Sequence, residues 1–248
     1  MPANKDPNEL GLQQAYGYQQ SSDLQRFYDD TANGYEKYIK DTGYALPVHL
    51  TNFIKDKISS KKLMVLDENT STFSFVNVFS SKKLMVLDVG CGTGAVGELL
   101  SAMNPHFSID GVDFSIEMIK IAGAKTVDPM SLEPNAGKQI YRSLIKTDLK
   151  TDYGIISDCR YDLMVSAGVF TTGHLGFDDL INLLPCVKQG GKVIVTVKKN
   201  VYENDEFHKR LNTAMCAGVI SDYEIEEVNI YDNDIYNDQS LILYFKRI

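Results

Sequence analysis

Apolar residues follow two alternating spacings from residue 84 to the end of the chain. Short runs rich in apolar and β-branched residues predict five buried strands, in KLMVLDVG, FSIDGVD, QIYRSLIKTD, YDLMVSAG and KVIVTVK. The segment GAVGELLSAM has apolar residues at helical spacing, and Ser115 is a good N-cap for a further helix. Strands that alternate with helices predict an α/β fold with a parallel sheet covered on both faces.

Helices and a hairpin are predicted on either side of this pattern. Residues 21–58 have aromatic and apolar residues at helical spacing, with a second run that opens at Pro47, near its first turn. Residues 205–218 predict a helix that ends at Gly218. The last two apolar runs, YEIEEVNIY and SLILYFKRI, are joined by the turn-rich DNDIYNDQ and predict an antiparallel pair.

The segment SSKKLMVLD occurs twice without change, at 59–67 and at 80–88. Only the second copy continues into VGCGTG, so the first copy cannot form the same turn. Removal of residues 68–88 would restore an uninterrupted SSKKLMVLDVGCGTG. We interpret this stretch as a local duplication, or an intron carried into a gene prediction, and a genuine extra strand is the alternative.

Composition narrows the protein class. The chain has 248 residues, of which 44% are hydrophobic and 23% charged, and this suits a single globular domain. No stretch approaches the roughly 18 consecutive apolar residues of a membrane helix, and the polar N-terminus lacks the apolar segment of a secretory signal. We therefore expect a cytoplasmic protein without membrane attachment, either a monomer or a weak dimer.

The net charge and the cysteine spacing restrict the kinds of ligand that the protein is expected to bind. A net charge of −8 and a pI near 5.0 disfavour nucleic acid as a partner, because such proteins bind through clustered Lys and Arg. The cysteines are too widely spaced for a zinc site and are expected to be free thiols: Cys91, Cys159, Cys186 and Cys216. No acid ends the fourth predicted strand to begin a magnesium site. We expect a small-molecule substrate and no metal.

A glycine-rich turn, VLDVGCGTGAVG, follows the first predicted strand. Gly90, Gly92 and Gly94 let the backbone turn sharply and approach a ligand with no Cβ in the way. The next helix offers its N-terminal amides to a polar or negatively charged group. Gly90, Gly92 and Ala95 also fit the GxGxxA fingerprint of dinucleotide-binding proteins, so the glycines alone leave the ligand open.

Two acids separate the candidate ligands. Asp113 ends the second predicted strand, where a carboxylate can accept hydrogen bonds from both hydroxyls of a ribose, and this suits NAD and S-adenosylmethionine equally. Asp88 lies just before the glycine turn, where a carboxylate can hold the loop and receive the polar groups of a cationic ligand. A pyrophosphate would be repelled there. Asp88 therefore favours S-adenosylmethionine, with an NAD-dependent oxidoreductase as the weaker alternative.

These motifs resemble those of the class I S-adenosylmethionine-dependent methyltransferases. VLDVGCGTG is similar to their first motif, GVDFS to their acidic-strand motif and LPCVKQGGKVIVTV to their turn into the fifth strand. The resemblance implies a Rossmann-like seven-stranded sheet in the order 3-2-1-4-5-7-6, with strand 7 antiparallel and helices on both faces. More narrowly, YDDTANGYEKYIKDTGY and AGVFTTGHL resemble the methyltransferase-like protein of the Williams-Beuren syndrome region.

This resemblance implies an N-terminal helical lid over the cofactor. We divide the chain into a flexible N-terminus at 1–20, a helical lid at 21–58 and a methyltransferase core at 59–248, in which 68–88 contains the repeated stretch. Tyr28 and Tyr35 are placed to share one face of a lid helix and are candidate binding residues. Packing against the sheet explains them equally well.

The resemblance also implies roles for residues near the first two strand ends. Gly90, Cys91 and Gly92 would line the methionine part of the cofactor. Asp113 would bind the ribose. Phe114 would lie beside the adenosine.

Further candidates follow the later strands. Asp148 and Leu149 match the position that recognises the adenine amine, Met118 would lie beside the adenosine, and Ala167 would border the methionine part. The structural alternatives are a solvated loop acid for Asp148 and a core residue for Met118.

The reaction needs few catalytic groups. Methyl transfer from a sulfonium is an in-line displacement, so holding the nucleophile about 3 Å from the methyl group supplies most of the catalysis. A general base matters only if the acceptor must lose a proton. His174 is the best candidate base because it follows the fourth predicted strand by a short loop, and packing within that loop is its alternative. Thr171 could hydrogen-bond a ligand or cap the same loop.

The sequence therefore predicts an enzyme that methylates a small molecule with S-adenosylmethionine. A non-catalytic S-adenosylmethionine-binding regulator is the main alternative, because an intact cofactor site does not require a base. A protein methyltransferase is a weaker one.

Overall fold

The computed structural model describes residues 15, 17–18, 20–59, 61–67, 72–78, 82–130, 135–156, 160–233 and 237–248. Most of the N-terminus that we predict to be flexible, and Cys159, lie outside these residues. Within them, no helix has both the length and the apolar character needed to cross a membrane.

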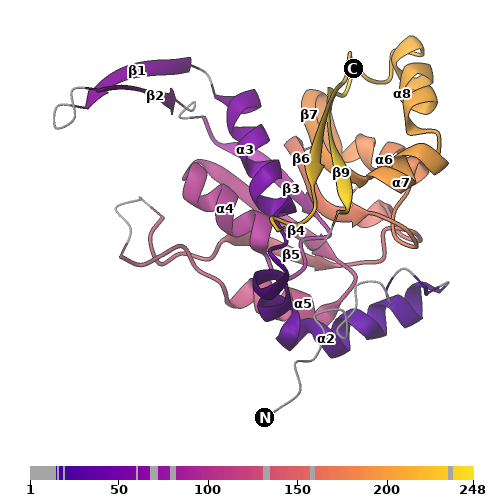
Figure 1. The fold of residues 1–248 in the computed structure, drawn as a ribbon. Helices are drawn as coiled ribbons and strands as arrows, with labels where there is room; N and C mark the ends of the chain where they lie inside the picture. Colours follow the sequence, from indigo (N-terminus) through magenta and orange to yellow (C-terminus); the bar gives the residue numbers. More distant parts are fainter. Residues whose placement is uncertain are drawn as a thin grey trace.

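A seven-stranded sheet forms the centre of the molecule (Figure 1). Its strands, in chain order, are β3 (Leu84–Val89), β4 (Phe107–Asp113), β5 (Tyr141–Lys146), β6 (Tyr161–Phe170), β7 (Val187–Lys198), β8 (Glu224–Asn229) and β9 (Gln239–Lys246). Their spatial order is β5-β4-β3-β6-β7-β9-β8. β3 pairs in parallel with β4 and β6, whereas β9 is antiparallel to both β7 and β8. The predicted order 3-2-1-4-5-7-6, with strand 7 antiparallel, is confirmed.

Two apolar cores cover the two faces of the sheet. One contains side chains of α3 (Leu46–Ile58), α4 (Ala95–Met103) and α5 (Ile116–Ala124). The other contains side chains of α6 (Phe177–Leu183), α7 (Lys199–Asn204) and α8 (Phe207–Cys216). The central strands are therefore apolar on both faces, and Val86 and Leu87 of β3 are each 0% exposed. The prediction of helices on both faces is confirmed.

The helices begin and end close to the predicted positions, with one difference. Ser115 caps α5 and accepts a hydrogen bond from the Met118 amide, and Gly218 has a positive φ of 68° just after α8. The single helix predicted over 205–218 is preceded by α7, and Glu206 separates the two helices with a φ of 50°. The spacing did not predict α7, because Val201 is its only buried residue. Two 3-10 turns, η2 (Gly154–Ile156) and η3 (Leu184–Cys186), complete the described helices with α2 (Ser21–Thr42).

The two copies of the repeat occupy different positions. The second copy contains all of β3, the central strand, except its last residue, Val89, whereas the first copy contains β1 (Lys61–Asp67). β1 pairs antiparallel with β2 (Thr72–Val78) in a separate two-stranded sheet. Figure 1 shows this hairpin extending from α3 away from the seven-stranded sheet. The first copy therefore adds no strand to the large sheet, and its origin by duplication stays a prediction.

Candidate functional site

The glycine turn after β3 brings the backbone against open space. Gly90, Gly92 and Gly94 all have positive φ angles, of 66°, 52° and 93°. A Cβ at Gly90 would clash with Val169, so this glycine is needed for packing. A Cβ at Gly92 would meet no protein atom within 4 Å. Gly92 therefore leaves room that a ligand can use.

A cavity opens at this turn, over the carboxyl ends of β3, β4, β5 and β6. It contains about 740 Å³ free of protein atoms, including the part open to solvent. Ligands of open α/β sheets bind at this edge, where successive connections leave to opposite faces. One side of the cavity is formed by α2, through Leu24, Tyr28 and Tyr35.

The structure brings most of the predicted site residues together at this cavity. The predicted residues that line it are Tyr28, Tyr35, Gly90, Gly92, Asp113, Phe114, Met118, Asp148, Leu149, Ala167 and His174. Four others do not line it: Asp88, Cys91, Gly94 and Thr171. Thr171 lines a second cavity, which Tyr28 and Tyr35 also line.

Asp113 is held at the end of β4 by backbone amides. Its Oδ2 accepts a hydrogen bond from Gly92 N at 2.8 Å, and its Oδ1 accepts one from Ser115 N at 2.9 Å. An ionised carboxylate has about four lone-pair sites, so each oxygen can accept a further hydrogen bond from a ligand. Asp113 is only 7% exposed, and this burial raises its pKa to about 6.

Asp88 lies deeper than we predicted. It is on the face of β3 covered by α3, α4 and α5, where its Oδ2 accepts a hydrogen bond from the Tyr141 hydroxyl at 2.7 Å. Its Oδ1 has no partner among the described residues. The side chain is 1% exposed, and burial raises its pKa to about 7. Asp88 therefore supports the turn from behind, and the structure does not place it where it could receive a ligand's polar groups.

Cys91 and Gly94 also face the protein interior. Cys91 is 6% exposed and packs in the same core as Tyr141. Gly94 is the N-cap residue of α4, and a Cβ there would lie 3.1 Å from the Tyr141 ring. The sequence placed these residues in the turn correctly, but only Gly90 and Gly92 of this turn line the cavity.

Tyr28 and His174 join α2 to the loop after β6. His174 Nδ1 lies 3.0 Å from the Thr172 carbonyl oxygen, which can only accept, so Nδ1 carries the proton. His174 Nε2 then accepts a hydrogen bond from the Tyr28 hydroxyl, at 2.9 Å. Burial lowers the pKa of His174 to about 4, so the ring is neutral at pH 7. His174 is thus a weak base whose unprotonated nitrogen accepts a hydrogen bond from Tyr28.

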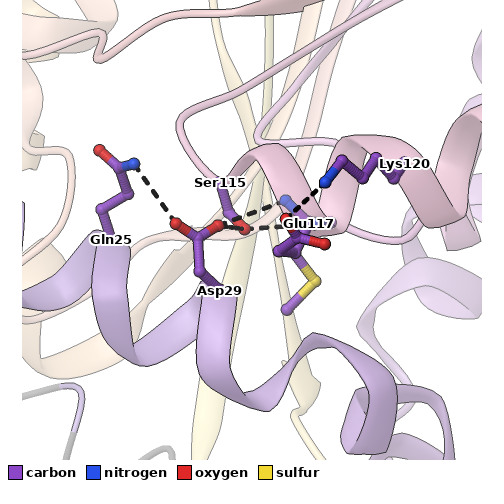
Figure 2. A network of polar contacts seen from close by, with 6 residues as sticks. Gln25, Asp29, Ser115, Glu117 and Lys120 are labelled. Atoms are coloured by element: carbon purple, nitrogen blue, oxygen red, sulfur yellow. Dashed lines mark hydrogen bonds and ion pairs between the residues drawn. The ribbon is translucent and has the colours of Figure 1, made fainter.

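A second contact joins α2 to the N-terminus of α5 (Figure 2). Asp29 Oδ1 accepts hydrogen bonds from Ser115 Oγ at 2.6 Å and from Glu117 N at 3.3 Å, and its Oδ2 accepts one from Gln25 at 3.4 Å. Partial burial raises the pKa of Asp29, but these hydrogen bonds outweigh it, and the pKa is lowered. The Ser115 backbone amide also donates to Asp113. Ser115 therefore connects Asp29 of α2 with Asp113 in the cavity.

Sequence reasoning missed several residues that line the cavity: Ser21, Leu24, Val112, Thr147, Lys150, Gly168, Val169 and Leu175. Leu24 lies one helical turn before Tyr28, and this spacing would have identified it. Val112 and Thr147 directly precede the predicted residues Asp113 and Asp148. Among the residues that the structure describes, no group of three His, Cys, Asp or Glu side chains is arranged to hold a metal ion.

Residues 87–193 match the family model described as Methyltransferase domain. No curated protein matches the chain in sequence.

The fold is similar to that of solved methyltransferases. A TehB-like SAM-dependent methyltransferase from Corynebacterium glutamicum has a TM-score of 0.50 and 18% identity, with 88% of this chain and 99% of that chain covered. A putative S-adenosyl-L-methionine-dependent methyltransferase from Methanococcus maripaludis has a TM-score of 0.53 and 20% identity, with 89% and 94% covered. A chain in the complex between the Haloferax volcanii Trm112 methyltransferase activator and the putative methyltransferase has a TM-score of 0.55 and 15% identity, with 89% and 97% covered.

Proposed function

We propose that this chain is an S-adenosylmethionine-dependent methyltransferase of the class I superfamily and that it transfers a methyl group to a small molecule; the match to the methyltransferase domain model and the similar folds support this. The observation that supports this most directly is the pairing of Gly92 with Asp113 in one cavity. The glycine leaves space for a ligand against the backbone, and the carboxylate of Asp113 has accepting capacity left beside it.

The residues of the cavity suit the parts of S-adenosylmethionine. Asp113 would accept hydrogen bonds from the ribose hydroxyls, and Phe114 and Met118 would pack against the adenosine. Asp148 and Leu149, just after β5, would recognise the adenine amine. The backbone at Gly90 and Gly92, with Ala167 across from it, would line the methionine part, and Cys91, Gly94 and Asp88 would support this turn from the core.

When bound, S-adenosylmethionine supplies an activated methyl group on a positively charged sulfur. The protein then needs to orient an acceptor and exclude water, because in-line displacement gains most from alignment of the two reactants. Tyr28 and Tyr35 of α2 are placed to cover the site. The Tyr28 hydroxyl bonds to His174, and Asp29 joins the same helix to α5.

The covered site favours a small acceptor over a protein. α2 forms one side of the cavity, and Leu24, Tyr28 and Tyr35 lie on it. A protein side chain would have to pass this helix, whereas a metabolite can enter the cavity whole. The weak basicity of His174 fits an acceptor that requires little or no deprotonation.

Calorimetric titration with S-adenosylhomocysteine, S-adenosylmethionine and NADH tests the cofactor. We expect the first two to bind and NADH not to bind. Preferential binding of NADH would contradict the proposal.

Turnover distinguishes the remaining alternatives. Incubation with S-adenosylmethionine and a metabolite extract should release S-adenosylhomocysteine and produce small molecules that gain a methyl group. Tight cofactor binding without release would favour a regulator, and label in a protein fraction would favour a protein methyltransferase.

A further inference from the structure

A second cavity adjoins the cofactor cavity. Tyr28, Tyr35 and Gly168 line both, so the two spaces meet beneath α2. The remaining wall of the second cavity comes from the start of α3, the ends of β6 and β7, and the start of β9. An acceptor in this space would lie next to the end of β6, where the proposed methionine part of the cofactor is bordered by Ala167.

Aromatic rings form much of this second cavity. The rings of Tyr28 and Tyr35 meet at 68° with centroids 6.3 Å apart, and Tyr44 lines the wall with its ring packed against Tyr231 at 6.0 Å. Rings packed in this way present apolar faces to the cavity. The cavity therefore suits a compact molecule with an apolar body.

Lys198, at the end of β7, gives this cavity its charge. Among the described residues that line it, Lys198 is the only charged one. Its side chain is 13% exposed and lies 3.4 Å from Asp238, whose own side chain is 49% exposed. Solvent screens the exposed carboxylate of Asp238, so this ion pair is weaker than a fully buried one. The ammonium is thus placed to bind an anionic group inside the cavity.

Thr171 adds a hydroxyl without a partner. It is 7% exposed and lines the cavity, and its Oγ1 forms no hydrogen bond with any described residue. Its backbone groups form the turn, through Thr171 N to Val169 O and His174 N to Thr171 O, so the hydroxyl is not needed there. A buried hydroxyl left without a partner indicates a ligand group that can donate to it or accept from it.

The described part of the second cavity lacks the usual side chains of a general base. None of the described residues that line it is Asp, Glu or His. The histidine of the adjoining cavity, His174, accepts from Tyr28 with its unprotonated nitrogen. An acceptor that carries no proton on its nucleophilic atom at neutral pH suits this cavity best.

We propose that the methyl acceptor is a small carboxylic acid whose carboxylate binds between Lys198 and Thr171, and that the product is its methyl ester. This rests on the proposed function, because it assigns a substrate class to the same site. Lys198 pairs with the negative charge, the Thr171 hydroxyl donates to a carboxylate oxygen, and the tyrosine rings cover the apolar body.

The step balances without a proton transfer. One carboxylate oxygen forms a bond to the methyl carbon while the bond from that carbon to sulfur breaks, and the electron pair of the broken bond stays on sulfur. The carboxylate loses its negative charge and the sulfonium its positive charge. The products are a neutral ester group and S-adenosylhomocysteine.

The linkage formed by the transferred methyl group tests this directly. The full chain is incubated with methyl-labelled S-adenosylmethionine and the small-molecule fraction of a cell extract, and the labelled products are treated with mild alkali. Methyl esters release labelled methanol, whereas N-methyl and ether products keep the label. We expect most of the label to be released.

Binding provides a second readout that does not depend on turnover. Benzoate, benzylamine and benzyl alcohol share one ring and differ in the polar group, so they serve as probes in calorimetry with S-adenosylhomocysteine present. We expect benzoate to bind most tightly. Lys198→Gln and Thr171→Val should each weaken benzoate binding about ten- to a hundredfold and leave binding of S-adenosylhomocysteine unchanged.

Control variants separate charge from folding. Lys198→Arg keeps the charge and should retain most benzoate binding. Lys199→Gln alters the neighbouring lysine, whose ammonium instead contacts Glu227 at 2.8 Å and Gln239 at 2.9 Å, and it should leave both ligands unaffected.

Three outcomes would contradict, respectively, the carboxylate acceptor, transfer to a small acid and the proposed function. Alkali-stable label, or tighter binding of benzylamine or benzyl alcohol, would overturn the carboxylate acceptor and leave the methyltransferase assignment standing. Cofactor binding with no labelled small molecule would overturn transfer to any small acid. Failure to bind S-adenosylhomocysteine would overturn the proposed function itself.

Discussion

Two buried carboxylates lie beside the glycine turn: Asp88 is in β3 just before it, and Asp113 ends β4 and accepts a hydrogen bond from Gly92 N. Burial raises the pKa of Asp88 to about 7 and that of Asp113 to about 6. Between about pH 4 and these values, the folded protein binds protons that the unfolded chain has released. The free energy of unfolding therefore falls as the pH rises through this window.

Asp88→Asn should flatten this pH dependence. One proton corresponds to a slope of about 1.4 kcal/mol per pH unit, and the variant lacks the part that Asp88 contributes. Urea unfolding at a series of pH values from 5 to 8 measures the slope. The Tyr141 hydroxyl can still donate to the amide oxygen, so the fold should persist. Equal slopes in the variant and the wild type would show that Asp88 titrates normally.

Asp113→Ala should weaken binding of S-adenosylhomocysteine by about 1.5 to 3 kcal/mol, the usual range for hydrogen bonds to a charged group. Calorimetry measures this loss. In the wild type, affinity should also decrease as the pH falls below about 6, because Asp113 is then protonated. Asp152→Ala, which removes an exposed acid after β5, is the control and should bind normally. Unchanged affinity in Asp113→Ala would remove this residue from the site.

Gly92→Ala should separate backbone strain from ligand space. Gly92 and Gly137 both have positive φ angles, 52° and 74°, and a Cβ at either would meet no protein atom within 4 Å. Alanine should lower the free energy of unfolding by about 1 kcal/mol at each position. Only Gly92→Ala should weaken cofactor binding, because only Gly92 lines the cavity. Equal cofactor affinity in the two variants would contradict the proposed approach of the ligand to Gly92.

Residues of the candidate site could be predicted where the neighbouring sequence identifies them. Asp113 and Asp148 follow apolar strands, and the local sequence is enough to find them. Lys198 and Gly168 are harder to predict, because they become neighbours of α2 only when the sheet has formed. For Asp88, the sequence predicted its place before the glycine turn but not its burial. That burial involves Tyr141, which comes from another strand.

At the scale of elements, sequence periodicity predicted the strands better than the helices. β3, β4, β6 and β7 are rich in apolar residues because most of their positions are buried, and this pattern is visible without tertiary information. β5 lies at the edge of the sheet, and its Arg142 and Lys146 are exposed. α7 has a single buried residue, so its sequence lacks an apolar stripe. α2 was predicted as a helix, but its contacts with α5 depend on Asp29, and no periodicity marks that residue.

Asp29→Ala should loosen α2 without unfolding the sheet. The change removes the acceptor for Ser115 and Glu117, and capping interactions of this kind are worth about 1 kcal/mol. Hydrogen exchange should become faster in α2, and S-adenosylhomocysteine should dissociate several times faster. Asp30→Ala alters the adjacent, exposed acid of the same helix and should change neither rate. Unchanged exchange in Asp29→Ala would show that α2 is held by other contacts.

At the scale of the whole molecule, the β1–β2 hairpin is the part least connected to the rest. Its two strands pair only with each other among the described residues, and both lie outside the seven-stranded sheet. α3 and β3, which flank the hairpin along the chain, both pack into the main fold. The hairpin is therefore an addition between two elements that are already joined through the core.

Deletion of residues 68–88 should leave a folded, cofactor-binding protein. The shortened chain keeps one copy of the repeat and continues directly into VGCGTG. Because loop length affects stability only weakly, we expect the free energy of unfolding to change by about 1 kcal/mol or less. Thermal unfolding and calorimetry with S-adenosylhomocysteine measure both properties. Val86→Asp, a charge at a position with 0% exposure, is the destabilised reference. An insoluble or non-binding deletion variant would show that the hairpin is required.

The repeat gives a newly made chain two identical candidates for one central strand. Before the glycine turn docks, β4 and β6 meet the same KKLMVLD sequence in either copy, and nothing in that stretch distinguishes right from wrong. Only the residues that follow, VGCGTG in one copy and ENTSTF in the other, decide which copy stays. In some chains the first copy pairs between β4 and β6 in place of β3, and this pairing must break before folding can finish. Refolding of the full-length protein should therefore include a slow phase that the shortened chain lacks.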